Sequence, residues 1–371
     1  MVTPVITGLA WDTPLGRDQE GVWSRLCAGE SGLAPVESPH PLRNALAAVV
    51  ESVPYGTAAG KRQRDLAGRA LAAAFADAGL STTDPRVGLV LGTSFGASLD
   101  EEEPTLHAWA DDAAAGIGHP GEPVCVMTAC SAGADAIAVA HALVRSGQRR
   151  ICVAGGVDVV TEAKRLGHSA LGTMSPTGIR AFDRARDGML LGEGAGFVVV
   201  EHPDSARERG ARVYARLRGA GASNDAAGLT APDPSGYAVV RAVRRCLASA
   251  GLAPADVAVV NAHGTGTTLN DEVEARSLLE LFGSGENAPL VFATKGAFGH
   301  SLGATGALEA VATVLALRHR QVPPVVGLRD PAAPLRLAMG SAHPVGAGVG
   351  LSLTLGFGGF NTCLLFEGMT A

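Results

Sequence analysis

The sequence contains no pair of cysteines in the Cys-x-x-Cys spacing that is typical of zinc and redox sites. Its six cysteines are scattered along the chain as Cys27, Cys125, Cys130, Cys152, Cys246 and Cys363. This scatter indicates neither a structural metal site nor a disulfide framework. We therefore expect no bound metal, and any cysteine that matters for function should act as a chemical reagent.

The chain also lacks an excess of positive charge and a long apolar run. Its formal net charge is −6 at pH 7, which offers no basic field to nucleic acid or to an anionic membrane surface. No run approaches the roughly 20 apolar residues of a membrane-spanning helix, and no basic segment near the N-terminus leads into a long apolar one. We expect a cytoplasmic protein that binds neither nucleic acid nor a membrane.

Motifs that bind nucleotide phosphates are missing as well. There is no Gly-Lys-Ser or Gly-Lys-Thr triplet. The glycine-rich stretch 192–196 precedes a predicted strand, whereas the dinucleotide-binding motif follows a strand and opens a helix. The sequence therefore predicts no nucleotide cofactor.

What the sequence does contain is apolar material for a large core, with 371 residues of which 47% are hydrophobic. Strand-like and helix-like segments alternate, and the order seen in the first half is repeated in the second. This self-similarity predicts an α/β fold built from a duplicated unit, with two sheets around shared central helices. Residues 31–60 show little periodicity and are expected to be loop. Helices are expected over 20–28, 62–79, the stretch that ends at 145, 237–250 and 303–317, and strands over 5–9, 87–91, the run that begins at 124, 151–156, 197–201, 257–260, 290–293, 348–355 and 362–366.

Cys130 lies where an apolar run stops at a turn of small residues and an alanine-rich helical pattern begins. Unpaired N–H groups and the positive end of the helix dipole at a helix N-terminus favour a thiolate over a thiol. A nucleophilic cysteine is one interpretation. The other is that Cys130 fills the core, as buried free cysteines commonly do.

Two histidines follow predicted strand ends in the second half. His263 stands between a strand and a turn rich in small residues, and His300 stands just before a helix of small residues. Each could be a turn residue bonded to backbone, but one cysteine and two histidines at equivalent strand ends predict a shared site. Lys295 and Glu309 nearby could form an ordinary ion pair.

Over nearly its whole length, the sequence resembles a type II β-ketoacyl synthase of the thiolase superfamily. The resemblance rests on motifs that occur in the order of the family: 5–9, 128–133, 182–189, 261–267, 295–306 and 356–359. It implies a duplicated thiolase-type fold with five αβαβα layers, two mixed sheets and central helices. The halves would be residues 1–207, with the nucleophile, and residues 208–371, with both histidines.

The resemblance also implies a reaction, the decarboxylating Claisen condensation of thioesters on an acyl carrier protein. Cys130 would hold the acyl chain, with thiolate character from the helix terminus and a neighbouring histidine. His263 and His300 would bind the malonyl thioester carbonyl and stabilise the enolate. Backbone N–H groups of Cys130 and Phe357 would hold the second oxyanion, and Phe357 would also match the gating phenylalanine of the family.

Further positions carry roles that the resemblance implies. Lys295 would support the site electrostatically, with Glu309 as its acidic partner. Thr265 and Thr267 would contact the pantetheine arm, and Met189 would line the acyl pocket. No cofactor is expected beyond the phosphopantetheine on which the carrier protein holds its substrates. The segment from residue 97 to residue 123 is shorter than is usual in the family, so pocket shape and dimer partner should differ there.

The expected partners are an acyl carrier protein and a second subunit, in a homodimer or a heterodimer with another ketosynthase-like chain. Lys61, Arg62 and Arg64 form a small basic cluster that could dock the acidic carrier, or they could be a solvated helix start. Two other functions stay open: acyl transfer without condensation, and a mainly structural role in a heterodimer. Polyketide and fatty-acid pathways are both compatible with the sequence.

Overall fold

A computed structural model describes residues 2–102 and 105–369. The first half contains β1 (Val5–Asp12), α1 (Gln19–Cys27), β2 (Leu33–Pro35), β3 (Leu46–Ala48), α2 (Ala59–Asp77), β4 (Val87–Gly92), α3 (Ala108–Gly116), β5 (Val124–Val126), the 3₁₀ turn η1 (Ala129–Ser131), α4 (Ala132–Arg145), β6 (Ile151–Asp158), α5 (Glu162–Ala170), β7 (Gly194–Glu201) and α6 (Pro203–Glu208). The second half contains β8 (Ala215–Asn224), α7 (Tyr237–Ala250), η2 (Pro254–Asp256), β9 (Val257–Asn261), α8 (Thr268–Phe282), β10 (Leu290–Phe292), α9 (Lys295–Phe298), η3 (Leu302–Ala304), α10 (Thr305–His319), β11 (Gln321–Val322), β12 (His343–Pro344), β13 (Val349–Gly356) and β14 (Phe360–Gly368).

The main sheet has ten strands in the order β10-β9-β13-β14-β8-β1-β7-β6-β4-β5. Each half contributes five strands with the same topology, because β4 lies parallel to β5 and β6 just as β9 lies parallel to β10 and β13. The next two pairings are antiparallel in both halves, β6 with β7 and β7 with β1, β13 with β14 and β14 with β8. The duplicated α/β fold is confirmed.

The two predicted five-stranded sheets also touch each other at one edge. Val5 and Ile6 of β1 pair with Arg216 and Ala215 of β8, and this short antiparallel contact joins the two five-stranded halves. The backbone continues its hydrogen bonding across the contact because an unpaired strand edge inside the molecule would leave buried polar groups without partners. The predicted boundary at residues 207 and 208 falls in the last turn of α6 and stays a prediction.

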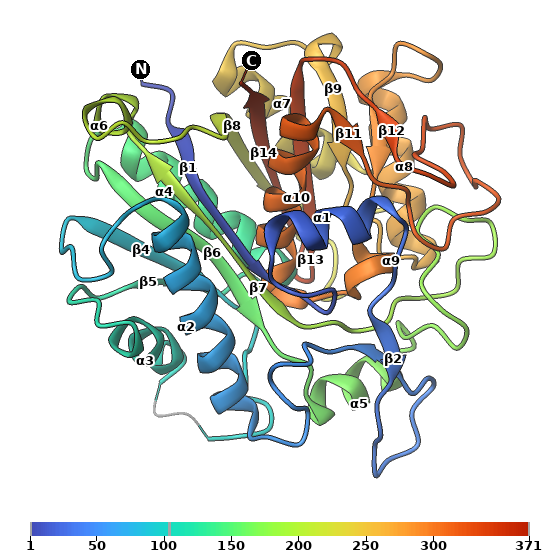
Figure 1. The fold of residues 1–371 in the computed structure, drawn as a ribbon. Coiled ribbons are helices and arrows are strands. Elements are labelled where there is room, and N and C mark those ends of the chain that lie inside the picture. Colours follow the sequence, from blue (N-terminus) through green and yellow to red (C-terminus); the bar gives the residue numbers. More distant parts are fainter. Residues whose placement is uncertain (1, 103–104, 370–371) are drawn as a thin grey trace.

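Two helices lie between the halves of the sheet, as Figure 1 shows for α10. Helix α4 packs on β6 and β4, and α10 packs on β13, β7 and α4. Residues 305–317 of α10 are all buried, so this helix presents no face to solvent, as expected of a helix covered on every side. Helix α2 covers the outer face of β1 and β7, and α7 covers β8 and β14. The layers are therefore αβαβα.

Several elements lay outside the sequence prediction. Residues 31–60 were expected to be loop but contain the two-stranded pair β2 and β3. Helices α3, α5 and α8 and strand β8 were also missed. Strand β8 is rich in glycine and alanine, which are weak strand formers. Gly219 and Gly221 stand where a side chain would collide with the backbone of α7, so this helix packs close against the sheet.

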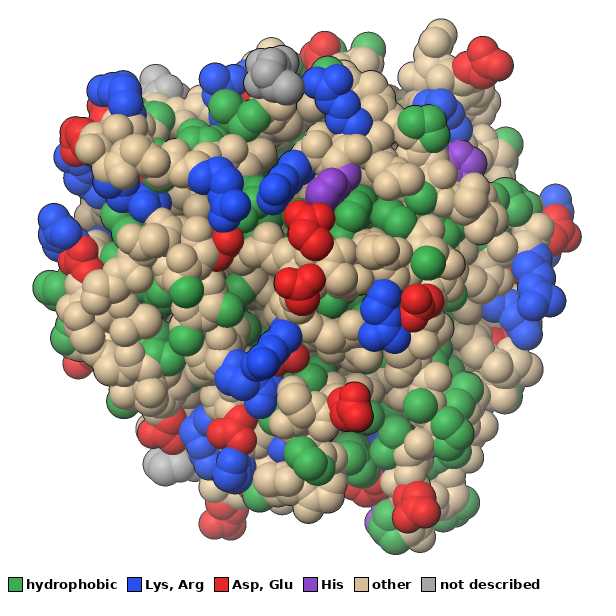
Figure 2. Space-filling model, viewed as in Figure 1, with side chains coloured by type: hydrophobic (Ala, Val, Ile, Leu, Met, Phe, Trp, Pro, Cys, Tyr) green, Lys and Arg blue, Asp and Glu red, His purple; other side chains and the backbone are tan. Residues whose placement is uncertain are grey.

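On the face shown in Figure 2, acidic and basic side chains are interspersed. Within residues 2–102 and 105–369, no helix is both long and apolar enough to cross a membrane. The same residues contain no group of three or more His, Cys, Asp or Glu side chains placed to hold a metal ion.

Candidate active site

Cys130 sits in the turn between β5 and α4, in the single 3₁₀ turn that precedes the helix. The residue before it, Ala129, has a φ of 51°, a conformation that a non-glycine residue adopts only when the surrounding structure enforces it. This turn places the cysteine at the N-terminal end of α4. Its side chain is buried.

The predicted thiolate character of Cys130 was wrong. Burial raises the pKa of the Cys130 thiol to about 11, and the nearby Lys295 ammonium and the backbone N–H of Phe357 only partly oppose this rise. The loss of water around the sulfur outweighs these two opposing contacts. The thiol is therefore protonated at neutral pH.

Phe357 lies in the tight loop between β13 and β14. Its backbone N–H hydrogen-bonds the sulfur of Cys130, and the hydroxyl of Ser131 donates to the carbonyl of Phe360 at 3.2 Å. Gly358 and Gly359 follow with φ of 83° and 79°, in the left-handed region that favours glycine. The loop thus brings a backbone donor against the cysteine from the opposite half of the chain.

His263 follows β9 and is held by a lysine from the next strand end. Lys295 Nζ lies 3.1 Å from Nδ1 of His263, also donates to the His263 carbonyl, and pairs with Glu309 Oε1 at 2.6 Å. Because an ammonium has only protons to give, Nδ1 accepts and the ring proton lies on Nε2. All three side chains are buried.

A backbone N–H group orients the ring of His300, so that its Nδ1 also accepts a hydrogen bond. The N–H of Leu302 donates to Nδ1 of His300 at 3.2 Å, and the hydroxyl of Thr305 lies 3.1 Å from the same nitrogen. This assigns the ring proton of His300 to Nε2 as well. The rings of His263 and His300 meet edge to face with centroids 5.3 Å apart.

Both histidines are neutral at physiological pH. Burial and the neighbouring Lys295 ammonium hold the pKa of His263 and of His300 well below 6.5. Burial raises the pKa of Glu309 to about 7, although its ion pair with Lys295 opposes the rise. The site therefore presents two neutral N–H donors close to one buried cation.

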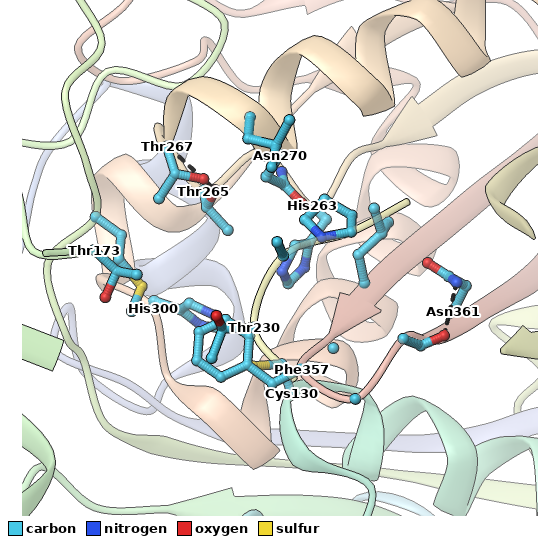
Figure 3. Close-up of a pocket in the computed structure, with 18 of the residues that line it drawn as sticks. Cys130, Thr173, Thr230, His263, Thr265, Thr267, Asn270, His300, Phe357 and Asn361 are labelled. Atoms are coloured by element: carbon cyan, nitrogen blue, oxygen red, sulfur yellow. Dashed lines mark hydrogen bonds between the residues drawn. The ribbon is translucent and has the colours of Figure 1, made fainter. Parts of the chain in front are cut away.

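These side chains converge on one cavity of about 200 Å³. In Figure 3, Cys130 and Phe357 lie together, and Thr265 and Thr267 lie on the opposite side of the two histidines. The hydroxyls of the two threonines are 2.8 Å apart. Seven predicted residues line the cavity, namely Cys130, Met189, His263, Thr265, Thr267, His300 and Phe357. Thr173, Thr230, Asn270 and Asn361 also line it and were missed by the sequence analysis.

Two buried acids that the sequence analysis missed shape the turn after β9. Glu274 of α8 accepts the backbone N–H of His263 at 2.7 Å and that of Gly264 at 2.8 Å, and Asp271 accepts the N–H of Gly266 at 3.1 Å. Burial raises the pKa of Glu274 to about 8. The sequence contained a clue to these two acids, because the glycine-rich turn has several backbone N–H groups and the helix that follows it carries carboxyl side chains within reach.

A third missed acid, Asp158, ties the two halves together behind Cys130. It accepts the backbone N–H of Ser94 at 3.0 Å and that of Gly303 at 2.9 Å, and it pairs with the buried Lys164. Gly303 belongs to the turn that follows His300. The carboxylate therefore fixes the turns at the ends of β4 and before α10 relative to each other.

The predicted docking cluster on α2 needs a correction at Arg62. Its side chain is buried, pairs with the buried Glu193 and donates to the carbonyl of Val160 at 2.8 Å, so it is unavailable to a partner. Lys61 is exposed, and its Nζ pairs with Asp65 Oδ2 at 2.5 Å. The Arg64 side chain is 35% exposed, and its Nε lies 3.8 Å from Asp112 Oδ2. The helical period turns positions 62 and 63 inward and positions 61 and 64 toward the surface.

Two family models match the chain. The model described as "Beta-ketoacyl synthase, N-terminal domain" matches residues 4–206, and the one described as "Beta-ketoacyl synthase, C-terminal domain" matches residues 214–329. Together they cover the turn of Cys130 and the turns of both histidines.

Similar proteins include 3-oxoacyl-[acyl-carrier-protein] synthase 2 of Synechocystis sp., which is 31% identical over 98% of this chain and 97% of its own length. Among solved structures, the ishigamide ketosynthase/chain length factor has a TM-score of 0.92 and 29% identity, and a β-ketoacyl synthase from Burkholderia phymatum has a TM-score of 0.89 and 29% identity. Both cover 100% of this chain and of their own. The resemblance seen in the sequence is confirmed: the chain belongs to the β-ketoacyl synthase family.

Proposed function

We propose that the chain catalyses the decarboxylating Claisen condensation of a malonyl carrier protein with an acyl chain held on Cys130. It would act as a discrete ketosynthase in polyketide or fatty-acid biosynthesis. The observation that carries the proposal is the shared cavity, in which one buried thiol meets two neutral histidines that each present an Nε2–H group. The name of the Synechocystis relative, a synthase of acyl-carrier-protein thioesters, supports the choice of substrate.

The first step loads the acyl chain. The Cys130 sulfur attacks the carbonyl carbon of the acyl thioester, the bond to the pantetheine sulfur breaks, and the proton of the Cys130 thiol ends on the departing pantetheine thiol. With a pKa of about 11, Cys130 reacts through a small thiolate fraction that the Lys295 ammonium and the Phe357 N–H favour.

The second step forms the carbon nucleophile. The malonyl thioester carbonyl accepts hydrogen bonds from Nε2–H of His263 and of His300, the bond to the carboxylate breaks, and carbon dioxide leaves. The electron pair moves onto the thioester oxygen as an enolate, which the two donors stabilise in a site with little water. Lys295 keeps the proton of His263 on Nε2 throughout.

The third step joins the two carbons. The enolate carbon attacks the carbonyl carbon of the Cys130 thioester, and the resulting oxyanion accepts hydrogen bonds from the backbone N–H groups of Cys130 and Phe357. The carbon–sulfur bond then breaks and Cys130 leaves as a thiolate. Support comes from the contact that the Phe357 N–H already makes with this sulfur.

The proposal includes two partners. An acyl carrier protein would meet Lys61 and Arg64 on α2, now without Arg62, and the pantetheine arm would pass Thr265 and Thr267. A second subunit, identical or ketosynthase-like, would cover the apolar side chains near the edge strand β5, where Phe95 is 54% and Val124 is 48% exposed. Native mass spectrometry of the purified and co-expressed protein distinguishes a homodimer from a heterodimer.

Mass spectrometry after incubation with acyl and malonyl carrier protein tests the reaction. A β-ketoacyl product is expected. Acyl-Cys130 without elongation would support acyl transfer instead, and no adduct would support a structural role. The Cys130→Ala variant should not load acyl groups, and persistent loading on it would contradict the mechanism.

A further inference from the structure

The Cys130 side chain borders two different regions. On one side is the cavity that also contains Thr265, Thr267 and Phe357, through which a thioester arm would reach the sulfur. On the other side is a compact apolar cluster of which Cys130 is itself a member. An acyl chain bound to the sulfur has to occupy the cavity or displace this cluster.

We call this group the back cluster; it consists of Val36, Ala47, Cys130, Val160, Met189, Leu191 and Leu302, with Val49 and Tyr55 packed against it. Its seven core members are all at most 7% exposed. Met189 belongs to the back cluster and also lines the cavity, so it stands at the boundary between them. A chain that grows past Met189 meets closely packed side chains, which do not yield without strain.

The outer wall of the back cluster is held by buried charge. Two arginines contact the Tyr55 ring, with the Arg62 and Arg165 guanidinium carbons 5.2 and 5.6 Å from its ring centroid. Its hydroxyl donates to Glu162 at 2.9 Å. Two cation–π contacts and a charged hydrogen bond fix the ring more firmly than apolar packing alone.

The same arginines fasten the chain around Tyr55. Arg165 donates to the carbonyls of Val36 at 2.7 Å and Ala45 at 3.1 Å, and Arg62 pairs with Glu193. Moving this wall outward would expose or unpair buried charges, which is expensive. The space behind Cys130 is therefore closed by a wall that resists opening.

We propose that this closed wall restricts the acyl chain on Cys130 to short acyl groups, with Met189 and Tyr55 as the residues that set the limit. The inference rests on the proposed function. It agrees with a cavity of about 200 Å³, which is smaller than the roughly 300–1,000 Å³ of typical ligand pockets and also has to admit the thioester arm. Arg62 and Arg165 act as positioning residues through Tyr55.

The test measures how fast acetyl-, butyryl- and octanoyl-pantetheine acylate Cys130, by intact-protein mass spectrometry with peptide mapping. The wild-type protein should load acetyl at least about 10-fold faster than octanoyl. In Met189→Ala this ratio should fall by about 10-fold or more, because the truncated side chain opens a path into the back cluster. Tyr55→Ala should lower the ratio in the same direction.

Matched variants separate the acyl limit from general damage. Met174 is also buried and forms a bridge with Met189 but lies outside the back cluster, so Met174→Ala should keep the wild-type ratio. Met189→Leu conserves volume and Tyr55→Phe conserves the ring, so both should keep it too. Equal loading of octanoyl and acetyl by the wild type would overturn this inference and leave the proposed function standing. Absence of any adduct on Cys130 would overturn the proposed function and the inference with it.

Discussion

The reactivity of Cys130 depends on opposing effects at a single sulfur atom. Burial disfavours the thiolate, whereas the Lys295 ammonium and the Phe357 N–H favour it, and burial is the larger effect. The helix terminus at Cys130 is visible in the local pattern of residues. Desolvation of the sulfur is not visible there, because the side chains that exclude water come from distant parts of the chain.

The pH dependence of thiol alkylation follows from this balance. With a pKa of about 11, the thiolate fraction of Cys130 rises about tenfold per pH unit between roughly pH 7 and 10. The rate of iodoacetamide labelling at Cys130, followed by peptide mapping, should rise in the same proportion, and Cys130→Ser should remove that peptide signal. A rate that levels off near pH 8 would show that the helix terminus outweighs burial after all.

Lys295 is expected to act through His263. In Lys295→Met the donor to Nδ1 is lost, so Nε2 no longer holds the ring proton reliably, and malonyl decarboxylation by acylated enzyme should fall about 100-fold or more. The same change leaves Glu309 buried without its cation, which lowers stability by about 3–5 kcal/mol.

A double variant separates these two effects. Lys295→Met with Glu309→Gln removes the unpaired charge, so its thermal midpoint should recover most of the loss while decarboxylation stays slow. Recovery of the rate in the double variant would contradict the role of Lys295 in fixing the His263 proton.

Helix α2 carries one buried cation and two cations at the surface, and replacing the two kinds should affect stability differently. Arg62→Met leaves Glu193 buried without a partner, so urea unfolding should show a loss of about 3–5 kcal/mol. Lys61→Glu and Arg64→Glu change side chains at the surface, so stability should stay within about 0.5 kcal/mol.

The surface variants should instead affect association. Charge reversal at Lys61 and Arg64 should weaken binding of an acidic carrier protein and reduce the dependence of that binding on salt, as measured by titration at two ionic strengths. Unchanged affinity in both variants would contradict the docking role of α2.

Sequence periodicity predicted the helices and strands that have one clear apolar pattern. Helix α7 occupies the predicted residues 237–250, and α10 and β13 differ from prediction by a few residues at their ends. The weak strand β8 and helices α5 and α8 escaped because tertiary contacts stabilise them more than local propensity does. In α8, for example, Asp271 and Glu274 face the turn of His263 instead of solvent.

At the level of the site, the sequence identified the reacting groups but missed their supports. Cys130, His263 and His300 occur in short motifs, so they could be found without a structure. Asp158 and Glu274 act from other elements on backbone N–H groups. Their roles depend on three-dimensional proximity that no local pattern encodes.

Across the whole molecule, buried carboxyl groups make stability depend on pH. Burial raises the pKa of Glu274 to about 8 and of Glu309 to about 7, both from 4.5. Between the unfolded pKa of 4.5 and these raised folded values, the folded chain retains protons that the unfolded chain has released. Raising the pH through this range therefore favours unfolding. The stabilisation is complete below about pH 4.5 and is lost as the pH rises through the folded pKa values.

Urea unfolding at several pH values measures this effect. The free energy of unfolding should fall by a few kcal/mol, in order of magnitude, between about pH 5 and pH 8. Glu274→Gln should flatten the profile, because it removes the group with the higher pKa. Stability that increases over this range would contradict the protonated state of Glu274 in the folded protein.

The two halves repeat a turn with positive φ, at Ala129 before Cys130 and at Leu302 before Gly303. Gly303 thus occupies in the second half the position that the nucleophile occupies in the first. A side chain there would collide with the backbone of Thr93 and Ser94, so the space that admits the second turn excludes a second thiol. Duplication doubled the scaffold but not the reacting atom, and active-site titration should therefore saturate at one acyl group per chain.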